Sequence, residues 1–188
     1  MANKGILVVI SGPSGVGKGT IIRELLKRND RLRFSVSATT RAPREGEIDG
    51  EVYHFVSRDE FLKMIDGGML LEYAEYSGNY YGTPAEPVDR LIDKGFSVVM
   101  DIEVQGAMQV MEKRPDATFI FIKPPSIETL EERLCARNTE TEESIRRRME
   151  TSVREMTYIG KYKYIIENDV LEEAVEAVSR AILSEENK

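Results

Sequence analysis

The sequence predicts an α/β fold: a parallel sheet with helices on both faces, an inserted β-rich subdomain and a short helical lid. Apolar runs of strand length recur along the chain and alternate with stretches of helical periodicity. The first run, residues 6–10, is apolar at every position, as in a strand buried on both faces. Residues 34–83 interrupt this alternation with several β-rich segments and one short helix, which indicates an insertion into the sheet.

A glycine-rich turn follows the first strand and leads into a helix with Ile21, Ile22, Leu25 and Leu26 on one stripe. Glycines also mark ordinary surface turns, but Gly-x4-Gly-Lys between a buried strand and an amphipathic helix is typical of a phosphate-binding loop. Its backbone N–H groups and the positive end of the helix surround an anion, and the lysine adds a charge. The pattern predicts a P-loop NTPase-type sheet that binds a nucleoside triphosphate. The residues expected there are Gly12, Pro13, Ser14, Gly15, Val16, Gly17, Lys18, Gly19 and Thr20.

One position departs from the usual loop. Gly19 follows Lys18, where Ser or Thr commonly supplies a hydroxyl to magnesium. We therefore expect the Mg²⁺ hydroxyl to come from Thr20, directly or through water, or to be replaced by water.

Composition and charge exclude several classes of protein. Of the 188 residues, 31% are charged and 41% hydrophobic, as in an ordinary soluble protein. The net charge of −7 argues against general nucleic-acid binding, which needs a basic surface. The single Cys135 excludes an internal disulfide and fits a reducing, cytoplasmic location, where it serves as a small apolar filler. No apolar run reaches the length of a membrane span, so we expect no membrane partner.

The remaining elements follow from periodicity. Further core strands are expected at 97–100, 118–122 and 164–166, and helices at 85–94, 103–113, 126–137, 142–158 and 170–184. The insertion is expected to contain strands in 34–40, 53–57 and 70–76 and a helix at 58–66. This divides the chain into a core of residues 1–33, 85–125 and 151–188, a subdomain of residues 34–84 and a lid of residues 126–150.

Residues 37–47 contain two arginines and three hydroxyl side chains near the end of a strand. Paired guanidinium groups suit a phosphate, because each offers two donors in one plane. The alternative is a solvated turn in which Arg41 and Arg44 pair with Glu45 and Glu47.

Two other clusters favour a second substrate. Residues 77–84 place adjacent tyrosines and small residues in what we interpret as a tight turn, with Glu72 just before it. Asp101 and Glu103 follow a buried strand, at the edge where open α/β sheets bind ligands.

At this point the chain resembles the guanylate kinase family, from about residue 6 to residue 183. The strings that carry the resemblance are Ser-Gly-Pro-Ser-Gly-Val-Gly-Lys, Phe-Ser-Val-Ser-Ala-Thr-Thr-Arg-Ala-Pro-Arg-Glu-Gly-Glu, Ser-Gly-Asn-Tyr-Tyr-Gly-Thr, Asp-Ile-Glu-Val-Gln-Gly and Arg-Asn-Thr-Glu-Thr-Glu-Glu-Ser-Ile. The resemblance implies transfer of a phosphoryl group from ATP to GMP, giving ADP and GDP, with Mg²⁺ as cofactor and a monomer or homodimer as the assembly. It also implies that residues 34–84 bind GMP and that residues 126–150 close over ATP.

The resemblance further implies roles for individual residues. The GMP phosphate is expected at Arg41, Arg44, Tyr53 and Tyr81, and the guanine at Ser37, Glu72 and Thr83. Gly82 is expected to line the same GMP site. Asp101 and Glu103 are expected near the nucleoside or the metal's water shell, Asn168 near the adenine, and Arg133, Arg137 and Arg148 at the ATP phosphates. Lys18, Arg41, Arg44, Arg137 and Arg148 are the expected catalytic residues.

The chemistry of these residue types is consistent with the implied roles. Guanine offers N1–H and N2–H₂ to one carboxylate, whereas adenine presents a lone pair there, so Glu72 can discriminate between them. Its alternative is a pair with an arginine or with backbone amides. Arg133 and Arg137 lie four residues apart on one helix face, and their alternative is surface pairing with Glu131 or Glu132.

Three alternatives concern the whole protein or its histidine. Guanylate-kinase-like domains without catalysis bind phosphopeptides, but the phosphate-binding loop and the lid arginines are intact here. A GTPase is disfavoured because the chain contains no Asn-Lys-x-Asp motif. His54 is interpreted as structural, since direct transfer between two phosphates requires no general base from it.

Overall fold

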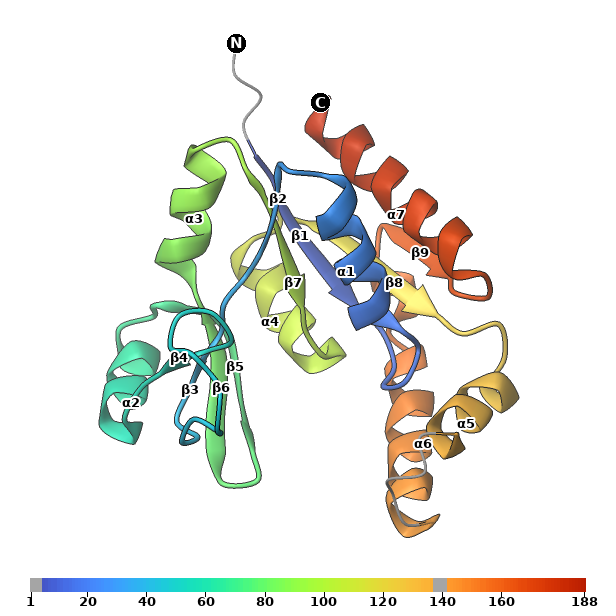
Figure 1. Ribbon diagram of the computed structural model, residues 1–188, viewed down its shortest axis with the longest axis horizontal. Helices are drawn as coiled ribbons and strands as arrows, with labels where there is room; N and C mark the ends of the chain where they lie inside the picture. Colours follow the sequence, from blue (N-terminus) through green and yellow to red (C-terminus); the bar gives the residue numbers. More distant parts are fainter. Residues whose placement is uncertain (1–4, 137–141) are drawn as a thin grey trace.

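Two sheets make up the framework of the computed structural model, which describes residues 5–136 and 142–188 (Figure 1). A five-stranded sheet has the order β2-β7-β1-β8-β9, and a four-stranded sheet has the order β4-β3-β6-β5. The strands are β1 Leu7–Ser11, β2 Leu32–Phe34, β3 Ala38–Thr39, β4 His54–Phe55, β5 Leu70–Tyr76, β6 Asn79–Pro84, β7 Ser97–Asp101, β8 Thr118–Lys123 and β9 Tyr164–Glu167. The helices are α1 Lys18–Arg28, α2 Arg58–Asp66, α3 Ala85–Asp93, α4 Val104–Lys113, α5 Ile127–Cys135, α6 Glu142–Met156 and α7 Leu171–Glu186, with a 3₁₀ turn at Ile159–Lys161.

The larger sheet is parallel throughout, as the sequence predicts. Its central strand β1 pairs with β7 on one side and with β8 on the other. Every residue of β1 is buried, because helices cover both faces of the sheet. Strands β2 and β7 lie on one side of β1, and strands β8 and β9 lie on the other. The strand order therefore reverses at β1, and open α/β sheets bind ligands at the carboxyl end of such a strand.

Alternate residues of β1 belong to two separate cores. Val8 and Ile10 pack with α1, α5 and α7, whereas Leu7 and Val9 pack with α3 and α4. This period of two follows from the pleat of the strand. The two cores hold the carboxyl ends of β1 and β7 in place, and these ends carry the phosphate-binding loop and Asp101.

The strand expected within 34–40 is confirmed as Ala38–Thr39, but the segment does not belong wholly to the insertion, because Phe34 ends a strand of the parallel sheet. Leu32–Phe34 pairs with β7 at the edge of the parallel sheet, and Ala38–Thr39 pairs with β4 and β6 in the smaller sheet. The residues between them turn the chain from one sheet into the other. Local composition is equally rich in β-forming residues on both sides, so only the pairing partners separate the two strands.

The tight turn expected at 77–84 is wrong in its extent. Only Ser77 and Gly78 turn the chain, with φ of 50° and 77°, and strand β6 begins at Asn79. Positive φ at both central residues is typical of a two-residue hairpin. Tyr80 and Tyr81 are therefore strand residues, whose side chains point to opposite faces of the smaller sheet.

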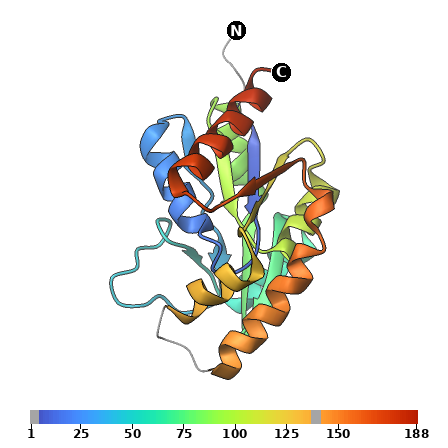
Figure 2. The same ribbon diagram turned by 90° about the vertical axis from the view of Figure 1, so that its right-hand side faces the viewer.

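The smaller sheet and the α5–α6 pair lie at the same end of the parallel sheet, on opposite sides of it (Figure 1). Helices α5 and α6 lie side by side there (Figure 2). Ser126 caps α5 by accepting a hydrogen bond from the Thr129 amide.

Of the expected lid, Arg137 lies outside the described residues. Among the residues that are described, no helix is long and apolar enough to cross a membrane.

Candidate active site

The loop between β1 and α1 takes a shape that only glycines permit. Gly12 has a φ of 143°, and a Cβ on it would lie 2.1 Å from the Ile122 carbonyl oxygen. Gly17 precedes helix α1 with a φ of 99°. Both positions favour glycine because L side chains rarely adopt such φ values. Lys18 is the first residue of α1, and its Nζ donates to the Gly12 carbonyl at 2.7 Å, so the ammonium lies across the mouth of the loop.

Side chains from distant parts of the chain hold this loop. Asn168 is buried after β9, and its Nδ2 donates to the Val16 carbonyl at 2.7 Å. Arg133 of α5 donates to the Asn168 carbonyl at 2.9 Å, and Arg148 of α6 donates to the Ser14 hydroxyl. Of the arginines expected at the ATP phosphates, Arg148 therefore reaches the phosphate-binding loop and Arg133 reaches the segment that supports it. The surface pairing of Arg133 with Glu131 or Glu132 is not formed among the described residues.

A cavity of about 420 Å³ opens between this loop and the end of β7. Lys18, Thr20 and Arg23 line one side, and Asp101 and Glu103 line the other. Burial raises the pKa of Asp101, an effect that the charge of Lys18 partly offsets. Arg23 was not predicted, although it lies one helical turn after Gly19 and therefore on the same face of α1.

A second cavity, of about 900 Å³, extends from the loop to helix α6. Its walls include Tyr76 at the tip of the β5–β6 hairpin and, on α6, Arg147, Arg148 and Glu155. Burial raises the pKa of the Glu155 carboxyl, and Lys18 opposes this shift. Sequence reasoning missed Glu155, although an acid in the last turn of a helix opposes the macrodipole and so signals another role.

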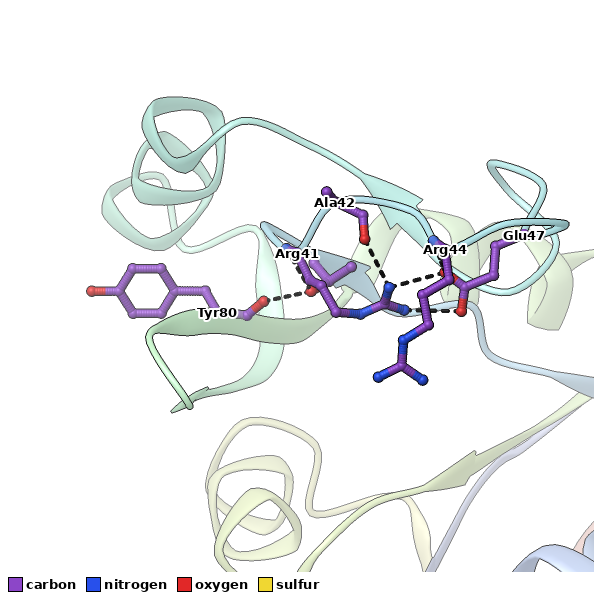
Figure 3. A network of polar contacts seen from close by, with 6 residues as sticks. Arg41, Ala42, Arg44, Glu47 and Tyr80 are labelled. Carbon is purple, nitrogen blue, oxygen red and sulfur yellow. Dashed lines mark hydrogen bonds and ion pairs between the residues drawn. The ribbon is translucent and has the colours of Figure 1, made fainter.

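Three of the predicted phosphate-binding residues, Arg41, Tyr53 and Tyr81, lie together. The guanidinium of Arg41 lies 5.6 Å from the centre of the Tyr53 ring, and that ring contacts Tyr81 edge-on at 5.9 Å. Arg41 also forms two hydrogen bonds of 3.0 Å with the Glu47 carboxylate (Figure 3). This ion pair raises the pKa of Arg41 and lowers the pKa of Glu47. The alternative Arg–Glu pairing is thus formed, within the cluster expected to bind phosphate.

Arg44 takes a different position. Its backbone N–H donates to the Glu47 carboxylate at 2.7 Å, while its side chain extends away from that network (Figure 3). Within the part of the chain that the structure describes, its guanidinium makes no hydrogen bond or ion pair. Glu47 therefore shapes the turn that carries both arginines, and the guanidinium of Arg44 remains available to an anion.

The three residues expected to recognise guanine form a chain of hydrogen bonds. The Thr83 hydroxyl donates to Glu72 Oε1 at 2.7 Å, and Ser37 Oγ lies 3.2 Å from Thr83 Oγ1. Glu72 is 7% exposed, and burial raises the pKa of its carboxyl. An irregularity in the pairing of β5 with β6 lies between Leu70 and Glu72, and such bulges re-aim a side chain. Gly82 lies beside this chain, where a Cβ would lie 2.7 Å from the Glu72 carbonyl oxygen.

The oxygens at the loop fit a magnesium ion held largely by phosphates and water. The Thr20 hydroxyl and the Asp101 carboxylate line the same cavity, and both are hard oxygen donors of the kind that Mg²⁺ prefers. No group of three or more His, Cys, Asp or Glu side chains suited to a metal occurs in the described ranges 5–136 and 142–188. A site with few protein ligands is usual where Mg²⁺ accompanies a nucleotide.

Comparisons with known proteins agree with this geometry. The profile of the guanylate kinase family matches residues 4–185. The guanylate kinase of Streptococcus thermophilus is 51% identical over 186 residues, which are 98% of this chain and 89% of that protein. The guanylate kinase of Clostridium perfringens is 48% identical over 183 residues, which are 97% of this chain and 85% of that protein.

Solved structures show the same relationship. The crystal structure of guanylate kinase from Anaplasma phagocytophilum superposes with a TM-score of 0.76 at 35% identity, covering 99% of this chain and 88% of that one. A gluconokinase from Sinorhizobium meliloti, at 17% identity and a TM-score of 0.53, shares the fold alone. The length of the match, the level of identity and the phosphate-binding loop together show that this chain belongs to the guanylate kinase family.

Proposed function

We propose that the two cavities beside the phosphate-binding loop align ATP and GMP for direct phosphoryl transfer. Membership of the guanylate kinase family makes the chain a phosphotransferase that converts ATP and GMP to ADP and GDP. No described side chain is needed as a nucleophile, because a phosphate oxygen of GMP attacks the γ-phosphorus directly.

The hydrogen-bonded chain of Ser37, Thr83 and Glu72 is the observation that carries the assignment of the GMP site. A carboxylate that is 7% exposed is costly unless donors compensate its charge. Thr83 supplies one donor to Oε1, and the N1–H and N2–H₂ groups of guanine would supply others. Of the alternative partners for Glu72, an arginine is absent among the described residues, whereas a backbone N–H, that of Thr83, does act on the carboxyl and lowers its pKa. Adenine has an acceptor in place of N1–H, so this arrangement selects guanine.

The phosphate of GMP binds the cluster of Arg41, Tyr53 and Tyr81, together with Arg44. The Arg41–Glu47 ion pair orients the guanidinium in advance and leaves its remaining N–H groups to a phosphate. The two tyrosine hydroxyls can donate to the same anion.

The triphosphate of ATP binds the backbone N–H groups of residues 12–20, with Lys18 and Arg148 at its charged oxygens. Arg133 and Asn168 act here by supporting the loop, and Asn168 also borders the adenine. Thr20 and Asp101 would hold Mg²⁺, directly or through water, and the ion would neutralise charge on the β- and γ-phosphates. Glu103 lies on the same side of the cavity, near the nucleoside and the water shell.

We assign residues 34–84 to a GMP-binding subdomain, residues 126–150 to a lid and the remainder to the core. Tyr76 of the hairpin and Arg147 of α6 line opposite parts of one cavity, so closure from either side would exclude water from the reacting phosphates.

An assay of nucleotide selectivity tests the proposed site. ADP release from ATP is measured with GMP, AMP, CMP and UMP as acceptors under identical conditions. We expect GMP to exceed AMP in kcat/KM by about 10⁴-fold, because the wrong base leaves Glu72 without its donors. Comparable rates with AMP would show that the Ser37–Thr83–Glu72 chain does not recognise the base.

A further inference from the structure

Helix α4 packs against the free edge of the smaller sheet. Strand β5 is the outermost strand on that side, so its outward backbone groups have no neighbouring strand. The side-chain amide of Gln109 takes that place: Nε2 donates to the Tyr73 carbonyl at 2.9 Å, and Oε1 accepts from the Tyr73 N–H at 3.1 Å. One turn further along α4, Lys113 Nζ donates to the Leu70 carbonyl at 2.8 Å. These three hydrogen bonds fasten β5 to α4 on both sides of Glu72.

Gly106 lies on the same face of α4, three residues before Gln109, and directly faces the Glu72 carboxylate. A Cβ on Gly106 would lie 3.0 Å from Glu72 Oε2 and 3.5 Å from its Cδ and Cγ. The position is buried in the first turn of α4, and alanine has a higher helix propensity than glycine. Glycine there weakens the helix, but it leaves room for the carboxylate.

We propose that Gly106 is a specificity-determining position, which sets the placement of the Glu72 carboxylate by the absence of a side chain. This inference rests on the proposed function, in which Glu72 recognises guanine. Gly106 itself touches no substrate and acts through Glu72, so it is a positioning residue.

Because β5 is hydrogen-bonded to α4, a methyl group added at Gly106 would displace the Glu72 carboxylate rather than the backbone of the strand. Gln109 and Lys113 hold the β5 backbone at a set distance from α4, so the strand cannot easily move away. The end of the Glu72 side chain is flexible and can shift by a few tenths of an ångström. Such a shift costs the fold little, but it moves Oε2 and disturbs the 2.7 Å hydrogen bond from Thr83. Recognition would therefore suffer while stability is kept.

The test is the variant Gly106→Ala, assayed with GMP and ATP and by thermal unfolding. We expect kcat/KM for GMP to fall about tenfold, because small misplacements of a recognition group cost much rate. The KM for ATP should stay the same, and the melting temperature should stay the same or rise, since alanine favours the helix. Gly160→Ala is the matched control: a Cβ there meets no atom within 4 Å, and we expect wild-type kinetics.

The variant Glu72→Ala and the double variant show whether Gly106 acts through Glu72. Glu72→Ala removes the group that the methyl would displace, so Gly106→Ala should have no further effect on kcat/KM in that background. An equal loss in both backgrounds, or no loss in Gly106→Ala alone, would overturn the inference and leave the proposed function intact. Wild-type use of GMP by Glu72→Ala would instead refute the guanine-binding role of Glu72, and the inference with it.

Discussion

Replacing Glu72 by glutamine separates recognition of the base from recognition of the phosphate. The substitution keeps the size of the side chain and keeps an oxygen that can accept from Thr83, which now donates at 2.7 Å. It removes the negative charge and exchanges the other oxygen for an NH₂ group. That donor would face a donor of guanine, so one hydrogen bond is lost and two donors are left opposed.

The size of the effect follows from the burial of the site. A hydrogen bond to a charged group contributes about 1.5–3 kcal/mol, and a buried donor without a partner costs about 1–3 kcal/mol. Because the two effects share one pair of atoms, we expect a combined loss on the order of 2–4 kcal/mol of transition-state binding. This corresponds to a fall of about 30- to 900-fold in kcat/KM for GMP.

The assay measures kcat/KM for GMP at saturating ATP, with ATP affinity determined separately by calorimetry. ATP binding should be unchanged, because Glu72 lies in the smaller sheet and outside the ATP site. If Glu72→Gln uses GMP as well as the wild type does, Glu72 does not recognise guanine, and Ser37 and Thr83 must carry the specificity.

The same variant makes a prediction about the pH dependence of stability. Burial raises the pKa of Glu72, so the ionised carboxylate destabilises the ligand-free protein. A carboxyl group whose pKa is raised by folding contributes stability below its unfolded pKa and loses it as the pH rises through its folded pKa. The melting temperature of Glu72→Gln relative to wild type should therefore be higher at pH 7 than at about pH 3, which lies below the unfolded pKa of glutamate, so that the carboxyl is largely protonated in both states. A difference that grows as the pH falls would contradict this sign.

Three further predictions concern the ATP site, the GMP phosphate and domain movement. Lys18→Ala should lower kcat by about a hundredfold or more, with GMP affinity unchanged by calorimetry, because its Nζ lies at the mouth of the ATP loop. Arg41→Lys should lower kcat/KM for GMP by about tenfold or more, since one ammonium cannot reproduce a two-pronged contact; wild-type rates would make Arg41 a surface residue. Small-angle scattering should show a smaller radius of gyration with ADP and GMP bound together than without nucleotide, and an unchanged radius would refute closure.

The sequence alone determined the parallel sheet and the phosphate-binding loop. Both depend on short-range patterns: an apolar run long enough for one strand, glycines where positive φ is required, and a lysine at the start of a helix. The predictions for β1, β7 and β8 are therefore confirmed with boundaries within one residue, and the helix expected after the loop is α1.

Long-range pairing decided what the sequence could not. Residues 34–40 look uniformly β-forming. In the structure, however, Leu32–Phe34 pairs with β7 and Ala38–Thr39 pairs with β6, so the chain passes from one sheet to the other within this segment. The sequence predicts a turn where strand β6 lies, because the tyrosines and small residues there show no clear alternation of polar and apolar side chains. Strand identity depends on partners that lie far along the chain, and local propensity does not encode them.

In the candidate site, too, the sequence names individual residues, whereas the tertiary structure decides their contacts. Glu72, Ser37 and Thr83 could be named from motifs, but their hydrogen-bonded chain exists only because β5, β6 and the segment before β3 come together. Gly106 ends the Asp-Ile-Glu-Val-Gln-Gly string, but no role was expected for it, and Glu155 lies in none of the quoted strings. Their environments are made by α4 packing along β5 and by α6 packing at the loop. Sequence determines which chemical groups are available, because they are read residue by residue. Tertiary structure alone decides which of them share a cavity, because burial and close approach arise only between segments distant in the chain.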